Sequence, residues 1–152
     1  MATVQCENPS ELHNLVDVEL PPTTWKEVDQ QSISLFADAT GDHQWIHVDE
    51  ERSIAGPYGT TIAHGYLTLA LIGPLFADVL AVTRASRVVN YGLDRVRFPA
   101  PLPSGTRVRL TSKISTASEV SGGVQVVVRA TVESENSGKP VCVADAVFRY
   151  FD

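Results

Sequence analysis

The chain has few of the features that would tie it to an oxidising compartment or to nucleic acid. Its 152 residues include two cysteines, Cys6 and Cys142, which stand far apart and form no CxxC pair. The formal net charge of -6 argues against nucleic acid as a partner, because phosphate binding needs a basic surface. The N-terminus also lacks the basic and apolar segments of a signal peptide. We therefore expect a cytoplasmic protein with reduced thiols.

Long apolar runs are also scarce. The most apolar window, residues 69–77, is too short to cross a bilayer, so no membrane insertion is expected. Hydrophobic content of 43% and charged content of 20% are typical of a globular protein. The length fits a single domain that spans residues 1–152. Residues 1–12 are polar and are expected to form a loose arm.

A short amphipathic helix is predicted in the first third of the chain. Apolar residues recur at helical spacing within residues 29–40, and Asp29 or Ser32 can cap the first turn. Gly41 ends the pattern and leaves Asp42 on the turn beyond the helix. Residues 49–55 predict a second short helix.

The middle of the chain predicts a buried helix, and the last part predicts strands. Residues 62–80 are almost all apolar or small, which is typical of a helix buried on every side. Because an interior proline breaks helical hydrogen bonding, we expect a kink or restart at Gly73-Pro74. An extended segment is expected at residues 15–28. Strands are predicted where apolar and polar residues alternate between turn formers: residues 88–98, 106–117, 124–133 and 141–150.

These elements have a simple packing solution, in which an antiparallel sheet wraps around the long central apolar helix. The connections between the predicted strands are short, which favours an antiparallel meander over parallel pairing. The fold class is therefore α+β. A single small sheet leaves an edge exposed, so an edge-to-edge homodimer is expected.

A proton-transfer pair is the main chemical signal. Asp42 and His47 are five residues apart and would face different ways on a continuous helix, so they converge only if the backbone turns after Gly41. An Asp and a His in one cleft can hold a water molecule and exchange protons with it. Gly65 opens the apolar helix, where a free backbone amide can stabilise charge on a carbonyl oxygen. The combination suits adding water to, or removing it from, a substrate with a carbonyl.

Other residues near this pair have two possible roles each. Trp45 and Ile46 can supply apolar walls for the cleft. His64 can orient its loop by hydrogen bonding or simply cap the helix. Thr68 can reach the cleft or bond back to the helix backbone.

A metal site is the rival interpretation. His43 and His47 have HxxxH spacing, with Asp42, Asp49 and His64 as further potential ligands. That spacing aligns two imidazoles only on a helix, whereas the sequence around Gly41 favours a turn. We therefore expect no metal.

The residues resemble the MaoC-like family of hot dog fold proteins, which includes R-specific enoyl-CoA hydratases of the hydratase 2 type. The resemblance is carried by Ala-Thr-Gly-Asp at 39–42, Ile-His-Val-Asp at 46–49 and Ile-Ala-His-Gly at 62–65. Weaker similarity follows at Val-Arg-Phe, 96–98. The family commonly has Asn-Pro between the catalytic Asp and His, where this chain has Gln44-Trp45, so Trp45 is expected to reshape the acyl pocket.

The resemblance implies reversible hydration of trans-2-enoyl-CoA thioesters to (R)-3-hydroxyacyl-CoA, a lyase reaction of fatty acid metabolism. It implies Asp42 and His47 as the catalytic dyad and the backbone amide of Gly65 as the oxyanion donor. No cofactor is expected, since the substrate itself carries CoA. Three alternatives stay open: a 3-hydroxyacyl-carrier-protein dehydratase, a non-catalytic acyl-binding subunit of a hydratase heteromer, and a thioesterase on the same fold.

Overall fold

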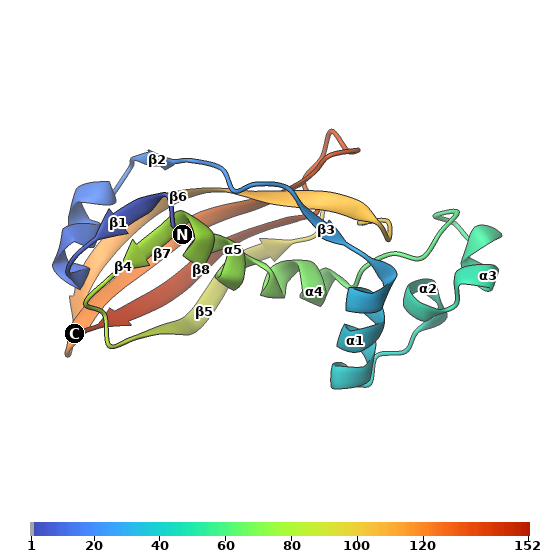
Figure 1. Cartoon of the computed structure of the whole chain (residues 1–152), viewed down its shortest axis with the longest axis horizontal. Coiled ribbons are helices and arrows are strands. Elements are labelled where there is room, and N and C mark those ends of the chain that lie inside the picture. Colours follow the sequence, from blue (N-terminus) through green and yellow to red (C-terminus); the bar gives the residue numbers. More distant parts are fainter. Residues whose placement is uncertain (1) are drawn as a thin grey trace.

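The computed structural model describes residues 2–152 and contains one large antiparallel sheet. The strands follow the order β2-β6-β7-β8-β5, and β3 also pairs with β6. Figure 1 shows the sheet as a curved layer with two helices, α4 and α5, running along its concave side. The strands are β2 (Glu19–Leu20), β3 (Lys26–Val28), β5 (Arg87–Arg97), β6 (Thr106–Val120), β7 (Gly123–Ser134) and β8 (Cys142–Phe151).

The alternating patterns place one face of the sheet in the core. In β7, Val126, Val128, Ala130 and Val132 are fully buried, while the alternate residues Val127, Arg129 and Thr131 are partly or fully exposed. Successive side chains of a strand point to opposite faces, so this alternation puts the valines against the helix. The four predicted strands and the antiparallel α+β hot dog architecture are confirmed.

The predicted central helix is two helices, α4 (Gly65–Ala70) and α5 (Ile72–Val79). The restart predicted from Gly73-Pro74 is confirmed, and the break itself falls at Leu71. Pro74 has no N–H for the carbonyl of Ala70 and its ring crowds that carbonyl, so the first helix ends there. Hydrogen bonding resumes with the Leu75 amide, which donates to Leu71 O at 3.0 Å. The long central helical region is therefore interrupted, as predicted, and consists of two short helices.

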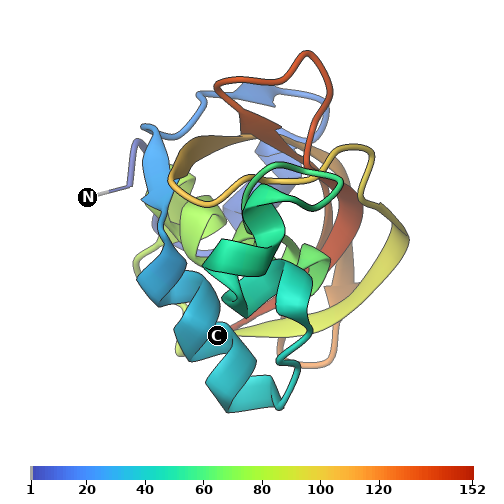
Figure 2. The same cartoon turned by 90° about the vertical axis from the view of Figure 1, so that its right-hand side faces the viewer.

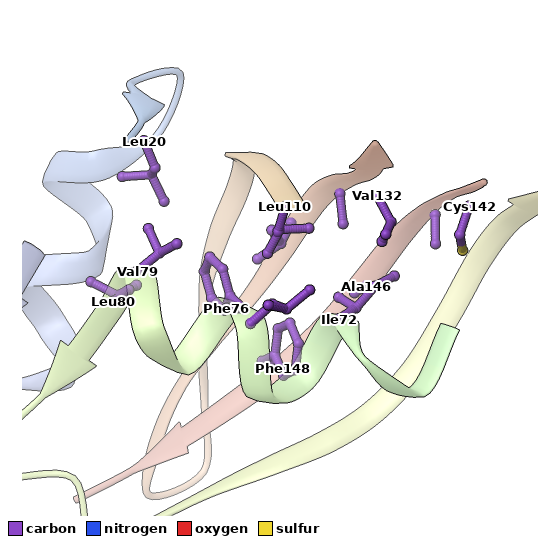
Figure 3. Packing of buried hydrophobic residues seen from close by; sticks show 14 of the residues in the cluster. Leu20, Ile72, Phe76, Val79, Leu80, Leu110, Val132, Cys142, Ala146 and Phe148 are labelled. Carbon is purple, nitrogen blue, oxygen red and sulfur yellow. The ribbon is translucent and has the colours of Figure 1, made fainter. Parts of the chain in front are cut away.

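Helix α5 supplies the centre of the core. In Figure 3, Ile72, Phe76 and Val79 point from the helix toward the sheet. Phe76 stacks on Phe148 of β8 with ring centroids 5.3 Å apart. Leu110 of β6 closes the cluster and is itself fully buried.

This helical region was expected to be buried on all sides. In the single chain that prediction is wrong, because one side of the helices is exposed. Tyr66 is 71% exposed, and Ala70, Pro74 and Ala77 are also exposed. All four project from the helices away from the sheet's buried face. The single chain therefore leaves part of the apolar surface of this helical region exposed to solvent.

The predicted meander holds for β6, β7 and β8 only. Strand β5 pairs with β8 rather than with β6, its successor in the chain. Residues 98–105 connect the edge strand β5 to β6, which lies on the far side of β8 and β7. This connection makes β5 an edge strand and lets the sheet curl around α4 and α5, as the end-on view in Figure 2 shows.

The N-terminal residues expected as a loose arm are ordered elements instead, apart from Met1, which lies outside the described residues. Strand β1 (Val4–Cys6) pairs in parallel with β4 (Leu80–Val82), and the 3-10 helix η1 (Pro9–Leu15) follows it. Leu12 has no exposed surface, so this segment belongs to the core. One leucine among polar residues carries too little pattern to reveal this burial.

Three short helices lie together at the opposite end of the molecule: α1 (Gln30–Thr40), α2 (Trp45–Val48) and α3 (Glu50–Ile54). Asp29 caps α1 by accepting from the Ser32 amide at 2.8 Å, and Gly41 ends it with φ of 80°. Both boundaries match the sequence prediction. Among residues 2–152, none of the helices has the length and apolar character needed to cross a bilayer.

Candidate active site

The turn after Gly41 brings the predicted dyad together. The left-handed conformation of Gly41 takes the chain out of α1, and a new helix, α2, starts at Trp45. A carboxylate oxygen of Asp42 and one ring nitrogen each of His47 and His64 lie within 4.8 Å of one another. Asp42 is exposed, whereas both histidines are buried. The structure thus gathers a carboxylate and two imidazoles at one point.

His47 is held with a defined ring orientation. Its Nδ1 lies 2.7 Å from the backbone oxygen of Ile62. A carbonyl can only accept, so Nδ1 carries the hydrogen and the lone pair of neutral His47 is on Nε2. The backbone oxygen of His47 accepts from Gln30 Nε2 at 2.8 Å, and Gln30 Oε1 in turn accepts from the Thr61 hydroxyl at 2.5 Å. This leaves His47 Nε2 as the available base.

His64 lies directly against His47. The two rings stack with centroids 3.8 Å apart and an interplanar angle of 23°. His64 Nε2 lies 2.9 Å from the backbone oxygen of Asp42, so it holds the turn that carries the carboxylate. The loop-orienting hydrogen bond considered for His64 is therefore present. Within the described chain, no side-chain cap bond is formed at the start of α4.

The amide of Gly65 starts α4 and has no acceptor one turn earlier within the helix, as expected for a helix start. A Cβ atom at this position would lie 3.0 Å from the Phe98 ring. Glycine therefore permits the close approach of an aromatic side chain here.

A cavity of about 290 Å³ adjoins His47 and Gly65. Its walls are mostly apolar, and Thr68 and Tyr58 contribute hydroxyl groups to them. The lining residues are His47, Tyr58, Ile62, Ala63, Gly65, Thr68, Phe98, Ala100, Pro101, Leu102 and Val141. An apolar cavity beside polar groups at one end is the usual form of a site for an acyl chain.

Of the other residues predicted to bind substrate, Thr68 lines this cavity, whereas Trp45 and Ile46 do not. The Thr68 hydroxyl donates to Gly65 O at 2.6 Å, so it bonds back to the helix while lining the cavity. Trp45 packs under the Arg52 guanidinium, 4.2 Å from the ring centroid, and against Gly56. Ile46 bonds through its carbonyl to the Ile62 amide at 3.0 Å. Neither Trp45 nor Ile46 lines the cavity of the single chain.

The HxxxH metal set is not assembled. His43 is exposed and pairs with Asp38 at 2.9 Å, and this hydrogen bond raises the pKa of His43. Asp49 caps α3 by accepting from the Arg52 amide. The set that does gather, Asp42 with His47 and His64, has two nearly parallel rings. A metal ion binds in the plane of each imidazole at about 2.1 Å, and two stacked rings do not direct their lone pairs at one such point.

Sequence reasoning missed four residues of this region. Gln30 and Thr61 brace His47 from α1 and from the loop before α4. Tyr58 and Phe98 line the cavity. Phe98 lies in the weaker family-like motif at residues 96–98, which was a usable signal. Thr61 directly precedes the Ile-Ala-His-Gly motif, which was also a usable signal. Gln30 and Tyr58 stand in segments whose pattern reveals no role.

An antiparallel sheet around a helical segment, with an Asp/His pair near an apolar cavity, is compatible with an enzyme of the hydratase and dehydratase class. The MaoC like domain matches residues 13–136, and the chain belongs to this family. It is 54% identical over 127 residues to 3-hydroxyacyl-thioester dehydratase Z of Mycobacterium tuberculosis, an alignment covering 83% of this chain and 84% of that protein. The chain is accordingly a lyase of MaoC type.

Solved structures share the fold. The R-hydratase PhaJ1 from Pseudomonas aeruginosa superposes with a TM-score of 0.72 at 22% identity, covering 88% of this chain and 81% of that one. The C-terminally truncated HadBC (3R-hydroxyacyl-ACP dehydratase) complex from Mycobacterium tuberculosis gives a TM-score of 0.65 at 18% identity, covering 86% and 92%. At these identities the likeness establishes the hot dog fold and nothing finer.

Proposed function

We propose that this enzyme reversibly hydrates trans-2-enoyl-CoA thioesters to (R)-3-hydroxyacyl-CoA, with Asp42 and His47 as the catalytic dyad. The observation that carries the proposal is the lone pair of His47 Nε2 beside the Asp42 carboxylate, next to an apolar cavity. The dyad takes a proton from water as the C–O bond forms, and this same proton is returned to the α carbon, so the addition needs no other proton source. The likeness to the R-hydratase PhaJ1 supports the R configuration of the product.

The proposed oxyanion donor is the backbone amide of Gly65. Water addition at the β carbon builds negative charge on the thioester oxygen, which a fixed N–H stabilises. The cavity continues from this amide past Thr68, Phe98 and Leu102, which we propose as contacts of the acyl chain. We keep Trp45, Ile46 and His64 as residues of the binding site, with Trp45 and Ile46 acting by shaping the turn that carries the dyad.

We propose that the reaction needs no metal and no cofactor besides the CoA of the substrate. The stacked geometry of His47 and His64 supports this, because the two rings do not converge on one ion. We also propose a cytoplasmic location, which the two unpaired thiols of Cys6 and Cys142 support.

A homodimer is the proposed assembly. Strand β5 is a long edge strand whose residues are nearly all exposed, including Val88, Val89, Tyr91 and Leu93. The exposed Tyr66 of α4 shares a hollow with Tyr91 and Leu93. An exposed apolar edge continuous with an apolar helix face favours pairing with a second copy, which would extend the sheet and cover the helices together.

The second candidate is dehydration of 3-hydroxyacyl groups on a carrier protein, which the same dyad would serve in the reverse direction. The likeness to HadBC, a 3R-hydroxyacyl-ACP dehydratase complex, supports this candidate and also supports a heteromeric assembly. A non-catalytic acyl-binding subunit is disfavoured, because this chain retains both Asp42 and His47 in mutual reach.

The test is the loss of conjugated-enone absorbance when the purified protein meets a short and a medium trans-2-enoyl-CoA, with and without a chelator. We expect hydration of at least one substrate, unaffected by the chelator, and an R product by chiral analysis. Activity confined to carrier-protein thioesters would favour the second candidate. Release of free thiol from saturated acyl-CoA would show thioester hydrolysis instead.

A further inference from the structure

His64 has a hydrogen-bonding state that mirrors that of His47. Its Nε2 lies 2.9 Å from the Asp42 carbonyl, so this nitrogen carries the hydrogen. The lone pair of neutral His64 is therefore on Nδ1. The site thus contains two imidazoles, and each has one nitrogen committed to a backbone carbonyl and one free to accept.

The free nitrogen of His64 is buried and has no partner among the described residues. The side chain is 3% exposed, and Nδ1 makes no hydrogen bond with residues 2–152. One face of the ring is covered by His47 at 3.8 Å, and Phe36 lies 4.9 Å away, measured between ring centroids. Neither ring offers Nδ1 a donor in the plane where the lone pair points. Buried acceptors without a protein partner usually bind an ordered water or take part in catalysis.

Asp42, His47 and His64 form one small polar cluster. A carboxylate oxygen of Asp42 and one ring nitrogen each of His47 and His64 lie within 4.8 Å of one another. Two atoms at such a separation are close enough for one bridging water to form a hydrogen bond with both of them. All three groups are acceptors in the state described, and a water molecule brings two donors.

We infer that His64 Nδ1 accepts a hydrogen bond from the water molecule that adds to the substrate, so that His64 is a third catalytic residue. The inference rests on the proposed hydration. One O–H of the water is directed at His64 and the other at the dyad, which turns an oxygen lone pair toward the β carbon. The second O–H bond then breaks as the C–O bond forms, and its proton passes to the dyad. The π electrons of the alkene form the new C–H bond at the α carbon with the proton that the dyad took from the water. His64 takes no proton.

Two isosteric substitutions separate this role from simple positioning of the loop. Asn in place of His places its amide oxygen near the Nδ1 position, while Gln places a donor near the Nε2 position. His64→Asn therefore keeps the acceptor and loses the bond to the Asp42 carbonyl, whereas His64→Gln does the reverse. We expect His64→Gln to lower kcat about a hundredfold with KM changed less than about threefold. His64→Asn should keep kcat within about tenfold of the wild type.

A different order of activities overturns the inference. If His64→Gln is close to the wild type and His64→Asn is impaired, the residue only positions the Asp42 turn. Equal losses in two variants that melt like the wild type also contradict a role specific to Nδ1. The melting temperature of each variant, measured by circular dichroism, separates loss of chemistry from loss of fold.

A measurement independent of activity accompanies the kinetics. A high-resolution crystal structure of the wild-type protein should show a water within hydrogen-bond distance of His64 Nδ1, and absence of that water overturns the inference even if a variant fails to fold. A wild type that hydrates no enoyl thioester would instead defeat the proposed function. Full hydratase activity with an unaffected His64→Gln would defeat this inference alone.

Discussion

The ring of His47 forms a hydrogen bond with the loop that carries His64, and the ring of His64 forms one with the loop that precedes His47. His47 Nδ1 bonds to the carbonyl of Ile62, two residues before His64, while His64 Nε2 bonds to the carbonyl of Asp42, the dyad partner of His47. The Ile62 amide also donates to Ile46 O at 3.0 Å. The loop after α1 and the loop before α4 are thus joined at three points around one pair of stacked rings. The carboxylate, both imidazoles and the Gly65 amide consequently form one rigid unit.

Removing either member of the dyad should abolish most of the activity. Asp42→Asn and His47→Gln keep the approximate shapes but cannot exchange protons, so we expect kcat/KM for an enoyl-CoA to fall by about 10²- to 10⁴-fold. Asp38→Asn is the matched control, because Asp38 is an exposed carboxylate that pairs with His43 outside the site. It should leave kcat/KM unchanged. Wild-type rates in either dyad variant would exclude the proposed mechanism.

Gly65→Ala should disturb the site through Phe98. The new Cβ would lie 3.0 Å from the Phe98 ring, which must move and take part of the cavity wall with it. We expect a loss of roughly 1–3 kcal/mol in the free energy of unfolding, the usual range for overpacking, and lower kcat/KM. Adding Phe98→Leu should restore stability, as measured by urea denaturation. If Gly65→Ala is as stable and active as the wild type, the close approach is not needed.

A charge on the edge strand should prevent dimer formation. Val89 of β5 is 38% exposed in the single chain and would be covered in the proposed homodimer. We expect Val89→Lys to run as a monomer in size-exclusion chromatography with light scattering. Leu35→Lys is the control, since Leu35 is 61% exposed on α1, away from that edge. A monomeric wild type would refute the proposed assembly.

The Cys142 thiol should resist alkylation in the native protein. Burial raises its pKa to about 11, although a hydrogen bond with Thr68 acts in the opposite direction. At pH 8 roughly one thiol in a thousand would then be ionised, and the thiolate is the reactive form. Mass spectrometry should show little modification by iodoacetamide before unfolding and rapid modification after it. Fast labelling of the folded protein at pH 8 would contradict this environment.

Asp29 should contribute stability in a pH-dependent way. Its hydrogen bond from the Ser32 amide lowers the pKa of the carboxyl group below its usual value. A lowered pKa in the folded state stabilises the protein above the pKa of the unfolded chain, about 3.9, and the benefit is lost as pH falls through the folded value. Asp29→Ala should therefore melt below the wild type at pH 7. The difference should shrink as the pH is lowered below about 4, and a constant difference across that range would contradict the assignment.

Much of this protein followed from the sequence, because the relevant signals are local. The cap at Asp29 and the stop at Gly41 were predictable, since both act through hydrogen bonds and backbone angles within a few residues. The four long strands followed from alternation with a period of two. The turn expected after Gly41 was enough to predict that Asp42 and His47 would meet, and the structure brings their side chains together.

Only the tertiary structure decided which distant segments meet. Strand β5 joins β8 rather than β6, and Leu12 enters the core from a segment that looks polar. His47 and His64 are 17 residues apart, and their stacking depends on backbone carbonyls that join two loops. The same contacts leave His64 Nδ1 without a partner among residues 2–152. Any residue can offer such a carbonyl, so this bonding leaves no mark in the amino-acid pattern. The sequence alone determined the local elements and the chemical groups, whereas their nonlocal contacts, and with them the third polar group of the site, arise only in the folded chain.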